Sequence, residues 1–597
     1  MTELVWDGKY RDGKRVAPVR IALPFQTVET VNESTRDRAR TLDLFAGGKP
    51  TEWRNRLVWG DKKYVLPSLL PEFAGQVKLI YIDPPFDTGA DFSFTRKIPD
   101  SDELLEKQPS MIEQKAYRDT WGRGLDSYMQ WFYETVVLLK ELLAQDGSVY
   151  VHVDENVGHY VKAVLDEVFG QESFQREIVW RIGWISGYKS AAKNWIRNHD
   201  TIFFYVKDRS RFTFNKEYIP YPVGYTRRDG SPPTGEGYPI EDVWNGTDLD
   251  RLDSIQIMSF SGEKVGYPTQ KNENLVSRII KASSNEGDLV LDCFVGSGTT
   301  PAVAEKLGRH WIGCDLGRFA IHTTRKRLLE VPGVKPFIVQ NLGKYERQAW
   351  LAAEFEAPED RAATEDTYRR FILDLYGAEP ISVHAWLHGA KSGRFVHVGA
   401  VDAPVTLADV KSIARDVWRA ATTMEKDSQR RASVEILGWE FAFELNEMAK
   451  QIAAEARVDV RFKQIPRDVL DKRAIEQGDV QAKDFFELRV FSTKESVKNR
   501  TASVALSDFM MPAEDLPEEV RTAVTHWSQW IDYWAVDWDF KNDTFHNQWQ
   551  SYRTRGEPKL KVEARHEYKE PGRYVVVVKV IDLLGCDTTK VISLEVE

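Results

Sequence analysis

The chain has 597 residues, well above the roughly 250–300 at which one hydrophobic core stops growing, so two or more domains are expected. Hydrophobic residues make up 42% and charged residues 29% of the chain, a balance that excludes disorder throughout. The formal charge of −10 disfavours a protein that coats nucleic acid with its whole surface, but it allows a local basic groove.

The sequence lacks the marks of export, membrane insertion and structural metal binding. No apolar run approaches the roughly 18 residues of a transmembrane helix, and the first residues (MTELVWDGK) lack the basic start and apolar core of a signal peptide. The cysteines Cys293, Cys314 and Cys586 are too widely spaced for a CxxC metal pair and too few for a disulfide framework. We therefore expect a soluble cytoplasmic protein without structural metal.

In the first half of the chain, short apolar runs alternate with amphipathic stretches, which predicts a parallel α/β sheet. Strands are expected at 77–82, 148–153, 201–206, 289–291 and 311–313, and helices at 125–144, 272–285 and 299–307. Residues 218–239 are so rich in Pro, Gly and Tyr that an irregular loop is expected there. A Pro/Gly break at 331–335 is expected to end this part of the chain.

The second half predicts a smaller α/β unit followed by an all-β tail. Helices are expected at 367–375 and 407–421, strands at 395–398, 434–437 and 458–462, and a linker at 511–517. The tail is rich in Trp and then in β-branched residues at 574–581, and it resembles small immunoglobulin-like PKD sandwiches. The predicted domains are 1–345, 346–505 and 518–597.

One motif is an apolar strand that ends in an acid, two prolines and an aromatic residue, in the run 79–86 (LIYIDPPF). Pro84 and Pro85 fix φ and remove two amide donors, so the chain leaves the strand in a rigid turn whose carbonyls are free to accept hydrogen bonds. Asp83 and the Pro84 carbonyl would accept the two hydrogens of a planar amino group, while Phe86 offers a stacking face for a flipped base. The alternative is an ordinary turn with a solvated aspartate.

A second motif, the run 292–300 (DCFVGSGTT), places two glycines between a strand and a helix. Gly296 and Gly298 let a nucleoside approach the backbone, and the helix that begins near Thr299 points its first amides at the ligand. Asp315, 23 residues after the first aspartate of this run, ends the next strand, where an acid can bind both ribose hydroxyls. A tight turn in any α/β protein, or a nicotinamide dehydrogenase, shares these features.

Together the two motifs resemble those of the permuted, β-type DNA amino-methyltransferases, in which DPP(Y/F) comes first, a target-recognition region next and FxGxGTT last. Here DPPF (83–86) and FVGSGTT (294–300) stand in that order, about 210 residues apart. Shorter matches accompany them at 60–61 (GD), 120–122 (TWG) and 267–272 (YPTQKN). Over roughly residues 50–330 the chain looks most like the Mod-type adenine methylases of type III restriction-modification systems.

The resemblance implies a Rossmann-like domain with a mixed seven-stranded sheet, S-adenosylmethionine as methyl donor, and transfer to an exocyclic amino group in duplex DNA. It implies that the catalytic residues, which hold the target base, are Asp83, Pro84, Pro85 and Phe86. The implied cofactor-binding residues are Asp292, Phe294, Gly296, Gly298, Thr299 and Asp315, with Gln270 and Lys271 near the methionine end. No metal is required, because the sulfonium already carries a good leaving group.

Two positions depart from the commonest family pattern. Phe86 replaces a tyrosine and keeps the stacking face, whereas Tyr267 replaces the usual histidine and leaves the finer cofactor contacts there open. Aspartate rather than serine at position 83 favours adenine N6 over cytosine N4 as the acceptor, because family members that act on cytosine usually carry serine. We expect an adenine-specific enzyme of a restriction-modification or phage-defence system.

The stretch 176–228 carries eleven Lys and Arg residues against four acids, a local charge of +7, together with several Trp and Tyr residues. It coincides with the target-recognition region that the resemblance implies at about 176–260, where cations would contact phosphates and other side chains would read base edges. The DNA-binding residues predicted here are Arg181, Lys189, Lys193 and Arg197. A solvated face with tryptophans in the core would also account for about half of these residues, including the strand residues 203–205.

Three other functions stay open at this point: a cytosine-N4 methyltransferase, a catalytically idle subunit that recognises DNA for a partner nuclease, and a nicotinamide dehydrogenase. The presence of Asp83, Gly296 and Asp315 argues against the idle subunit. A dehydrogenase predicts neither the DPPF turn nor the basic stretch. The sequence shows no Walker loop, so DNA cleavage would belong to a partner restriction subunit. A homodimer is also open.

Overall fold

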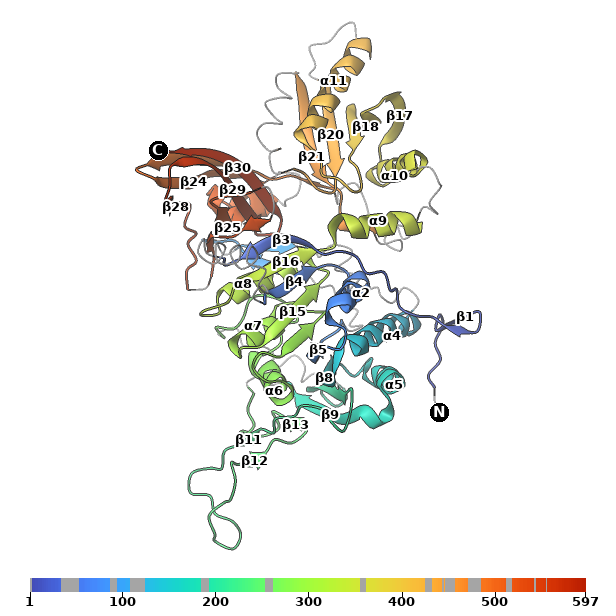
Figure 1. The fold of residues 1–597 in the computed structure, drawn as a ribbon, viewed down its shortest axis with the longest axis vertical. Helices are drawn as coiled ribbons and strands as arrows, with labels where there is room; N and C mark the ends of the chain where they lie inside the picture. Colours follow the sequence, from blue (N-terminus) through green and yellow to red (C-terminus); the bar gives the residue numbers. More distant parts are fainter. Residues whose placement is uncertain are drawn as a thin grey trace. The chain divides into compact units, whose positions relative to one another are not determined.

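The structure is a computed structural model, and it describes residues 3–33, 53–85, 94–101, 103–107, 124–183, 193–252, 261–354, 361–424, 432–442, 445, 457–470, 485–511, 518–541, 544–554 and 556–597. The chain divides into two units (Figure 1). The first unit comprises Met1–Thr27, Ala39–Phe94 and Glu113–Asn341, and the second comprises Val28–Arg38, Thr95–Ile112 and Leu342–Glu597.

The first unit is built on a mixed sheet. Its strands lie in the order β13 (Val243–Trp244), β9 (Phe174–Arg181), β10 (His199–Val206), β8 (Leu143–Val153), β5 (Val77–Ile82), β14 (Leu289–Asp292), β15 (His310–Asp315), β4 (Asn55–Trp59) and β16 (Phe337–Asn341). Strand β10 is antiparallel to both of its neighbours, whereas the other neighbouring strands are parallel. The predicted mixed sheet is confirmed, and within the described residues β13 and β16 extend it beyond the seven strands expected.

Helices cover both faces of this sheet (Figure 1). Neighbouring helices on one face are α2 (Lys62–Phe73), α4 (Leu125–Leu142) and α5 (Gly158–Phe169), and those on the other are α6 (Glu273–Ser283), α7 (Thr299–Lys306) and α8 (Arg318–Leu329). This double cover explains why β5 (VKLIYI) and β14 (LVLD) read as almost unbroken apolar runs, since a parallel strand is buried on both sides. The helices predicted at 125–144, 272–285 and 299–307 correspond to α4, α6 and α7.

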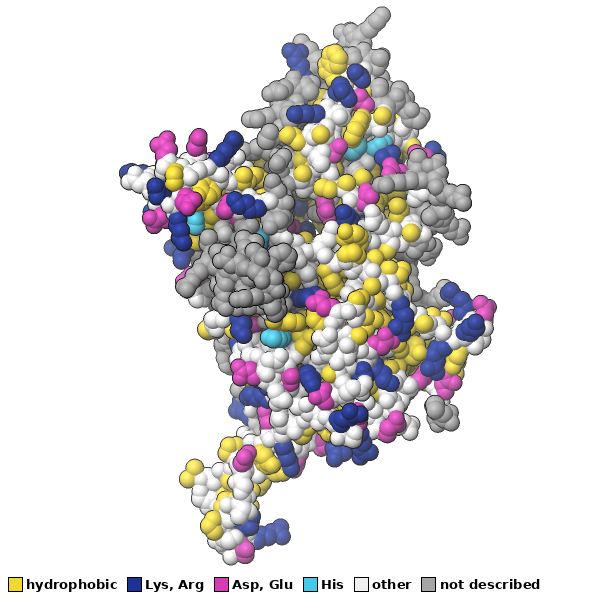
Figure 2. All heavy atoms as spheres, in the orientation of Figure 1, with side chains coloured by type: hydrophobic (Ala, Val, Ile, Leu, Met, Phe, Trp, Pro, Cys, Tyr) yellow, Lys and Arg dark blue, Asp and Glu magenta, His cyan; other side chains and the backbone are white. Residues whose placement is uncertain are grey.

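The Pro/Gly/Tyr-rich segment 218–239 forms an arm that projects from the first unit (Figure 1). Its two ends pair as the short antiparallel strands β11 (Tyr218–Ile219) and β12 (Tyr238–Pro239), and turns and loops occupy the residues between them. The predicted irregular loop is therefore correct for the interior of the segment. Figure 2 shows hydrophobic side chains along the arm, and Val223 and Tyr225 are among the exposed apolar residues there.

The second unit contains an α/β part with a six-stranded sheet. Its strands are β17 (Glu379–His384), β18 (Leu387–Lys391), β19 (Arg394–Val398), β20 (Ala432–Gly438), β21 (Val458–Gln464) and β22 (Phe486–Glu487), and its helices are α9 (Gly343–Glu354), α10 (Arg361–Tyr376) and α11 (Leu407–Met424). Parallel pairing of β19, β20 and β21 forms its centre. The second α/β region expected from the sequence is present.

The C-terminal part of the second unit is all-β. One sheet is ordered β27 (Trp549–Tyr552), β25 (Ile531–Asp537), β29 (Gly572–Asp582) and β30 (Asp587–Val596), and a second is ordered β23 (Val490–Lys498), β24 (Thr501–Met510) and β28 (Glu563–Glu567). Buried side chains of both sheets, such as Val504 and Trp534, belong to one hydrophobic core. Residues 490–505, which the sequence assigned to the middle domain, therefore pair with the tail.

Smaller elements complete the second unit. They are β3 (Gln26–Val31), β6 (Phe94–Lys97), β7 (Leu104–Lys107), α14 (Glu518–Ala523) and β26 (Phe545–His546), while β1 (Tyr10–Arg11) and β2 (Lys14–Arg15) belong to the first unit. Strand β3 pairs with β26, and Glu29 of β3 forms a buried ion pair with Lys579 of β29, 2.8 Å between Oε2 and Nζ. Of the linker predicted at 511–517, only Met511 lies in the described residues. No helix of the described ranges is long and apolar enough to span a membrane.

Candidate active site

Three aspartates mark the carboxyl ends of three adjacent parallel strands. Asp83 follows β5, Asp292 ends β14 and Asp315 ends β15. Strand β14 pairs with both β5 and β15, so motifs about 210 residues apart in sequence meet at one edge of the sheet. In open parallel sheets, ligands bind beyond the carboxyl ends of the strands. This edge is therefore the candidate active site.

Asp83 presents an unused hydrogen-bond acceptor at this edge. Its Oδ2 forms an ion pair with Lys271, and both side chains are largely buried. Its Oδ1 is buried and has no hydrogen-bond partner among the described residues. A buried acceptor without a partner is rare in proteins and fits a donor that arrives with a ligand. Pro84 and Pro85 follow in the turn, whereas Phe86 lies outside the described residues.

Asp292 fixes the glycine turn through two hydrogen bonds. Its Oδ1 accepts a hydrogen bond from the Phe294 backbone N–H at 2.9 Å, and its Oδ2 accepts one from the Thr300 hydroxyl at 2.6 Å. Burial raises the pKa of Asp292 to about 7, even though both hydrogen bonds favour the ionised form. Its carboxylate therefore ties the start of the turn to the first residues of α7.

Asp315 supports the other side of the same turn. Its Oδ2 accepts from the Gly296 N–H at 2.9 Å and its Oδ1 from the Gly317 N–H at 2.8 Å. Gly296 has a φ of +48°, and a Cβ there would lie 3.2 Å from the ring of Tyr267. Both carboxylate oxygens of Asp315 thus hold the backbone on this side of the turn. Tyr267, the unusual residue before Pro-Thr-Gln-Lys, thus packs against the glycine turn.

Gly298 is required where the turn becomes a helix. Its φ is +77°, and an added Cβ would approach Thr324 Oγ1 to 2.7 Å and the Thr324 Cα to 2.9 Å. Both the left-handed backbone and the close contact exclude larger residues without rearrangement. Helix α7 begins at Thr299 without a capping side-chain hydrogen bond.

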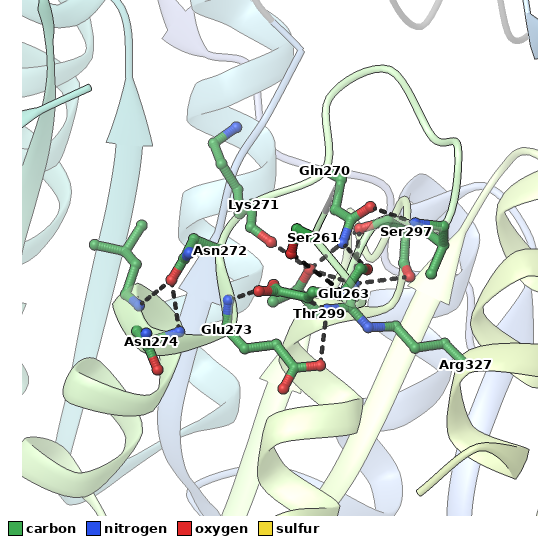
Figure 3. Close-up of polar contacts among 12 residues, drawn as sticks. Ser261, Glu263, Gln270, Lys271, Asn272, Glu273, Asn274, Ser297, Thr299 and Arg327 are labelled. Carbon is green, nitrogen blue, oxygen red and sulfur yellow. Dashed lines mark hydrogen bonds and ion pairs between the residues drawn. The ribbon is translucent and has the colours of Figure 1, made fainter. Parts of the chain in front are cut away.

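The segment 263–273 is joined to the glycine turn by a network of polar contacts (Figure 3). Gln270 donates to the Glu263 carbonyl at 2.7 Å and accepts from the Val265 N–H at 2.9 Å, so its amide closes this loop on itself. The Thr299 hydroxyl donates to the Lys271 carbonyl at 3.0 Å. Thr299 therefore joins this segment to the glycine turn, and Gln270 fixes the shape of the segment. Both residues are predicted to bind the cofactor, and that contact stays a prediction.

Arg327 of α8 completes this network, and sequence reasoning missed it. Its Nη1 donates to the Thr299 hydroxyl at 2.8 Å, and its Nη2 forms ion pairs with Glu273 at 2.9 Å and Glu263 at 3.3 Å (Figure 3). A buried guanidinium with two carboxylates and a hydroxyl uses its fixed donor geometry to join two other segments to α8. Nothing in the local sequence around Arg327 marks this role, because its partners come from other segments.

A second group missed by sequence reasoning surrounds Phe294. The Trp131 ring of α4 lies 5.5 Å from the Phe294 ring, and the Lys62 ammonium lies 3.9 Å from the Trp131 ring centroid. Burial lowers the pKa of Lys62. The aromatic pair and the buried amine give the glycine turn an apolar wall with one polar group.

Of the predicted DNA-binding residues, Arg181, Lys193 and Arg197 are exposed in the first unit, and Lys189 lies outside the described ranges. Arg181 ends β9, and the other two precede β10. Arg197 forms ion pairs with Glu155 and Asp200. Its guanidinium therefore has a structural task besides any contact with phosphate.

The sequence profile of the DNA methylase family matches residues 77–326, which include the whole edge described above. "Type II methyltransferase M.EcaI" of Enterobacter cloacae is 30% identical over 333 residues, covering 46% of this chain and 69% of the relative. The chain belongs to the DNA methylase family. The methylase is thus a DNA methyltransferase, and the family's methyl donor is S-adenosylmethionine.

Other relatives resemble the methylase over different spans. "DNA adenine methyltransferase YhdJ" of Escherichia coli (strain K12) is 28% identical over 47% of this chain and 86% of its own length. The "Type III restriction-modification enzyme EcoP15I Mod subunit" of Escherichia coli is 28% identical over 26% of this chain and 24% of its own length. A solved structure entitled "crystal structure of M1.HpyAVI-SAM complex" shares 19% identity over 46% of this chain and 98% of that chain, with a TM-score of 0.28.

The residues at the strand edge of the methylase fit S-adenosylmethionine. Two glycines with positive φ open the backbone of the turn, and the carboxylate of Asp315 lies beside it. Phe294 adds an apolar face beside Trp131. When bound, the cofactor supplies a methyl group made electrophilic by its sulfonium. The turn would hold the nucleoside of the cofactor, and Asp83 lies on the neighbouring strand.

Proposed function

We propose that this methylase transfers a methyl group to the exocyclic N6 of adenine in duplex DNA. The observation that carries the proposal is Asp83 Oδ1, a buried acceptor without a partner in the described residues, located one strand away from the glycine turn. An amino group offers two hydrogens, and the Asp83 carboxylate and the Pro84 carbonyl would accept one each. This arrangement points the nitrogen lone pair away from the two acceptors and toward the methyl donor.

In this proposal the ion pair with Lys271 holds the Asp83 carboxylate in place beside the target base. The amino nitrogen gains a methyl group and must then lose one hydrogen as a proton. Asp83 Oδ1, already hydrogen-bonded to that hydrogen, is the atom placed to receive it. Positioning the two reacting atoms and excluding water are the main tasks of such a site.

Two considerations support adenine over cytosine. Aspartate stands before the two prolines, where the resemblance associates serine with cytosine-N4 enzymes. The name of the relative YhdJ describes an adenine methyltransferase. We further propose that Pro85 and Phe86 complete the base site, and that Arg181, Lys189, Lys193 and Arg197 contact DNA. The alternatives, cytosine N4 and a catalytically idle subunit, are outcomes of the test below.

We also propose that the methylase serves a restriction-modification or related defence system and acts with a partner restriction subunit. Support comes from the resemblance to a Mod subunit of a type III restriction-modification enzyme, which covers 26% of this chain. The all-β tail and the middle α/β part, which lie outside residues 77–326, would then provide surfaces for that partner or for a second copy of the chain.

The test is transfer of labelled methyl from S-adenosylmethionine to unmethylated duplex DNA, followed by nucleoside analysis. The proposal expects N6-methyladenine from the wild-type protein. N4-methylcytosine would refute the base assignment and keep the reaction class. The protein could also bind the cofactor but transfer no methyl group to DNA of mixed sequence, both alone and when co-expressed with its partner subunit. That result would favour the idle recognition subunit.

A further inference from the structure

Trp195 is the most exposed large apolar side chain near the active-site edge. It is 99% exposed and lies in the segment 193–198, just before β10. Exposed cations lie near it in sequence, at Lys193 and Arg197. Another exposed cation, Arg181 of β9, is paired with His199 at the start of β10. An indole that is fully exposed to water, with Lys193 and Arg197 two residues away on either side in sequence, suits a polyanion whose interior is a stack of aromatic rings.

The topology places this segment at the same edge of the sheet as Asp83. Strand β8 is parallel to β5, and Ile82, just before Asp83, is opposite Val151. Strand β10 is antiparallel to β8, and Thr201 near its start is opposite Val153. The residues that precede β10 therefore emerge where β5 and β8 end, beside the site proposed for the target base.

A chain of side-chain contacts ties the base of this segment to the strand that carries Asp83. Arg197 forms an ion pair with Asp200, and Asp200 Oδ2 lies 3.3 Å from His152 Nε2. On the other side of the ring, His152 Nδ1 lies 3.0 Å from the hydroxyl oxygen of Tyr81. Tyr81 is fully buried on β5, two residues before Asp83. Four side chains thus connect the segment to the catalytic strand.

The backbone of the segment is fixed on its other flank. Asn198 donates from its side chain to the Gly183 carbonyl at 2.7 Å, and its own carbonyl accepts from the Ile182 N–H at 2.9 Å. Trp195 is therefore an exposed ring on a short segment anchored at its base, which limits the entropy lost when the ring is buried in a complex.

We propose that Trp195 enters the DNA duplex where the target base leaves it and stacks in the vacated space. This inference rests on the proposed function, because a base must leave the stack to reach Asp83. An inserted apolar side chain compensates the lost stacking, as in proteins that wedge such residues between bases. The four residues of this chain of contacts, Arg197, Asp200, His152 and Tyr81, are therefore positioning residues for Trp195.

The first test compares intact target duplexes with duplexes that carry a mismatch at the target base. The target sequence comes from sequencing the methylated DNA of a host that expresses the protein. For Trp195→Ala we expect transfer on the intact duplex to fall about tenfold or more, as for the loss of one stacked base. The mismatch should restore most of that loss, because a mismatched base leaves the stack more easily. S-adenosylmethionine binding should not change.

Matched variants separate stacking from a general loss of structure. Trp195→Phe keeps a stacking ring and should retain most activity, and Trp418→Ala removes an indole that is 54% exposed on α11 of the second unit and should have no effect. Tyr81→Phe removes one anchoring contact and should show a smaller defect that the mismatch also relieves. A Trp195→Ala defect of equal size on both duplexes, or no defect, would overturn the inference.

A binding measurement tests the inference independently of methyl transfer. A duplex with one abasic site offers a ready-made gap, so the wild-type protein should bind it about tenfold more tightly than the intact duplex, and Trp195→Ala should lose this preference. That result in a protein without transfer activity would refute the proposed methyl transfer, while the insertion of Trp195 at a gap in the duplex would stand. The same preference in Trp195→Ala as in the wild type would refute the inference alone.

Discussion

Substituting Asp292 by asparagine isolates the effect of its charge on the stability of the first unit. Asparagine can keep both observed contacts, because its carbonyl accepts from the Phe294 N–H and its amide donates to the Thr300 hydroxyl, which then acts as acceptor. The substitution thus removes a buried carboxylate while leaving the geometry of the turn largely unchanged.

The pKa of Asp292 gives the expected change in the free energy of unfolding. Burial raises the pKa of Asp292 from its usual 3.8 to about 7, which corresponds to about 4 kcal/mol. For an acid with a raised pKa, the contribution to stability is complete below pH 4 and is lost as the pH rises through 7. Between pH 5 and 8 the wild-type protein should therefore lose about 2–3 kcal/mol through this group, a loss that Asp292→Asn avoids.

Thermal unfolding of the first unit at several pH values from 5 to 8 measures this difference. The wild-type protein should melt a few degrees below Asp292→Asn at pH 8, and the gap should close toward pH 5. Asp248→Asn, at an exposed aspartate of the same unit, serves as the control and should follow the wild type. Parallel curves for wild type and Asp292→Asn would refute the reasoning from burial.

Three further substitutions have defined outcomes. Lys271→Met removes the ion pair that orients the Asp83 carboxylate, so methyl transfer should fall about tenfold or more; a wild-type rate would contradict this. Gly298→Ala forces a left-handed alanine against Thr324 and should cost about 1–3 kcal/mol in chemical denaturation and weaken cofactor binding, whereas wild-type values would show that the turn relaxes. The guanidinium of Arg489 lies 3.0 Å from the buried carboxylate of Asp582. Arg489→Met leaves that carboxylate without a counter-ion, so it should destabilise the second unit by about 3–5 kcal/mol and leave the melting of the first unit unaltered.

Local patterns in the sequence were sufficient to predict the elements that position the site. Strand β5 was predicted at its observed bounds, because a short apolar run between Gly-Gln and Asp-Pro-Pro is typical of a buried strand. The glycine turn was equally local, because it needs residues without a Cβ at adjacent positions. The meeting of the two motifs followed from family resemblance and from the rule that parallel strands share their carboxyl ends.

Contacts between distant segments could not be predicted in this way. The chain from Tyr81 through His152 to Asp200 joins three strands, and each residue alone is indistinguishable from an ordinary core or surface residue. The same holds for Arg327, whose three partners lie on two other segments. The pairing of β3 with β26 spans more than 500 residues and leaves no periodic signal in either strand.

The assignment of Asp83 to the target base is tested most directly by a substitution that should affect methyl transfer but not cofactor binding. Asp83→Asn keeps the shape of the side chain but replaces one carboxylate oxygen with an amide donor, on a different strand from the glycine turn. Equilibrium binding of S-adenosylmethionine and methyl transfer to duplex DNA are then measured on the same preparation. The account predicts near wild-type binding with transfer reduced at least a hundredfold, about 3 kcal/mol. Wild-type transfer by Asp83→Asn would contradict the assignment of Asp83 to the target base.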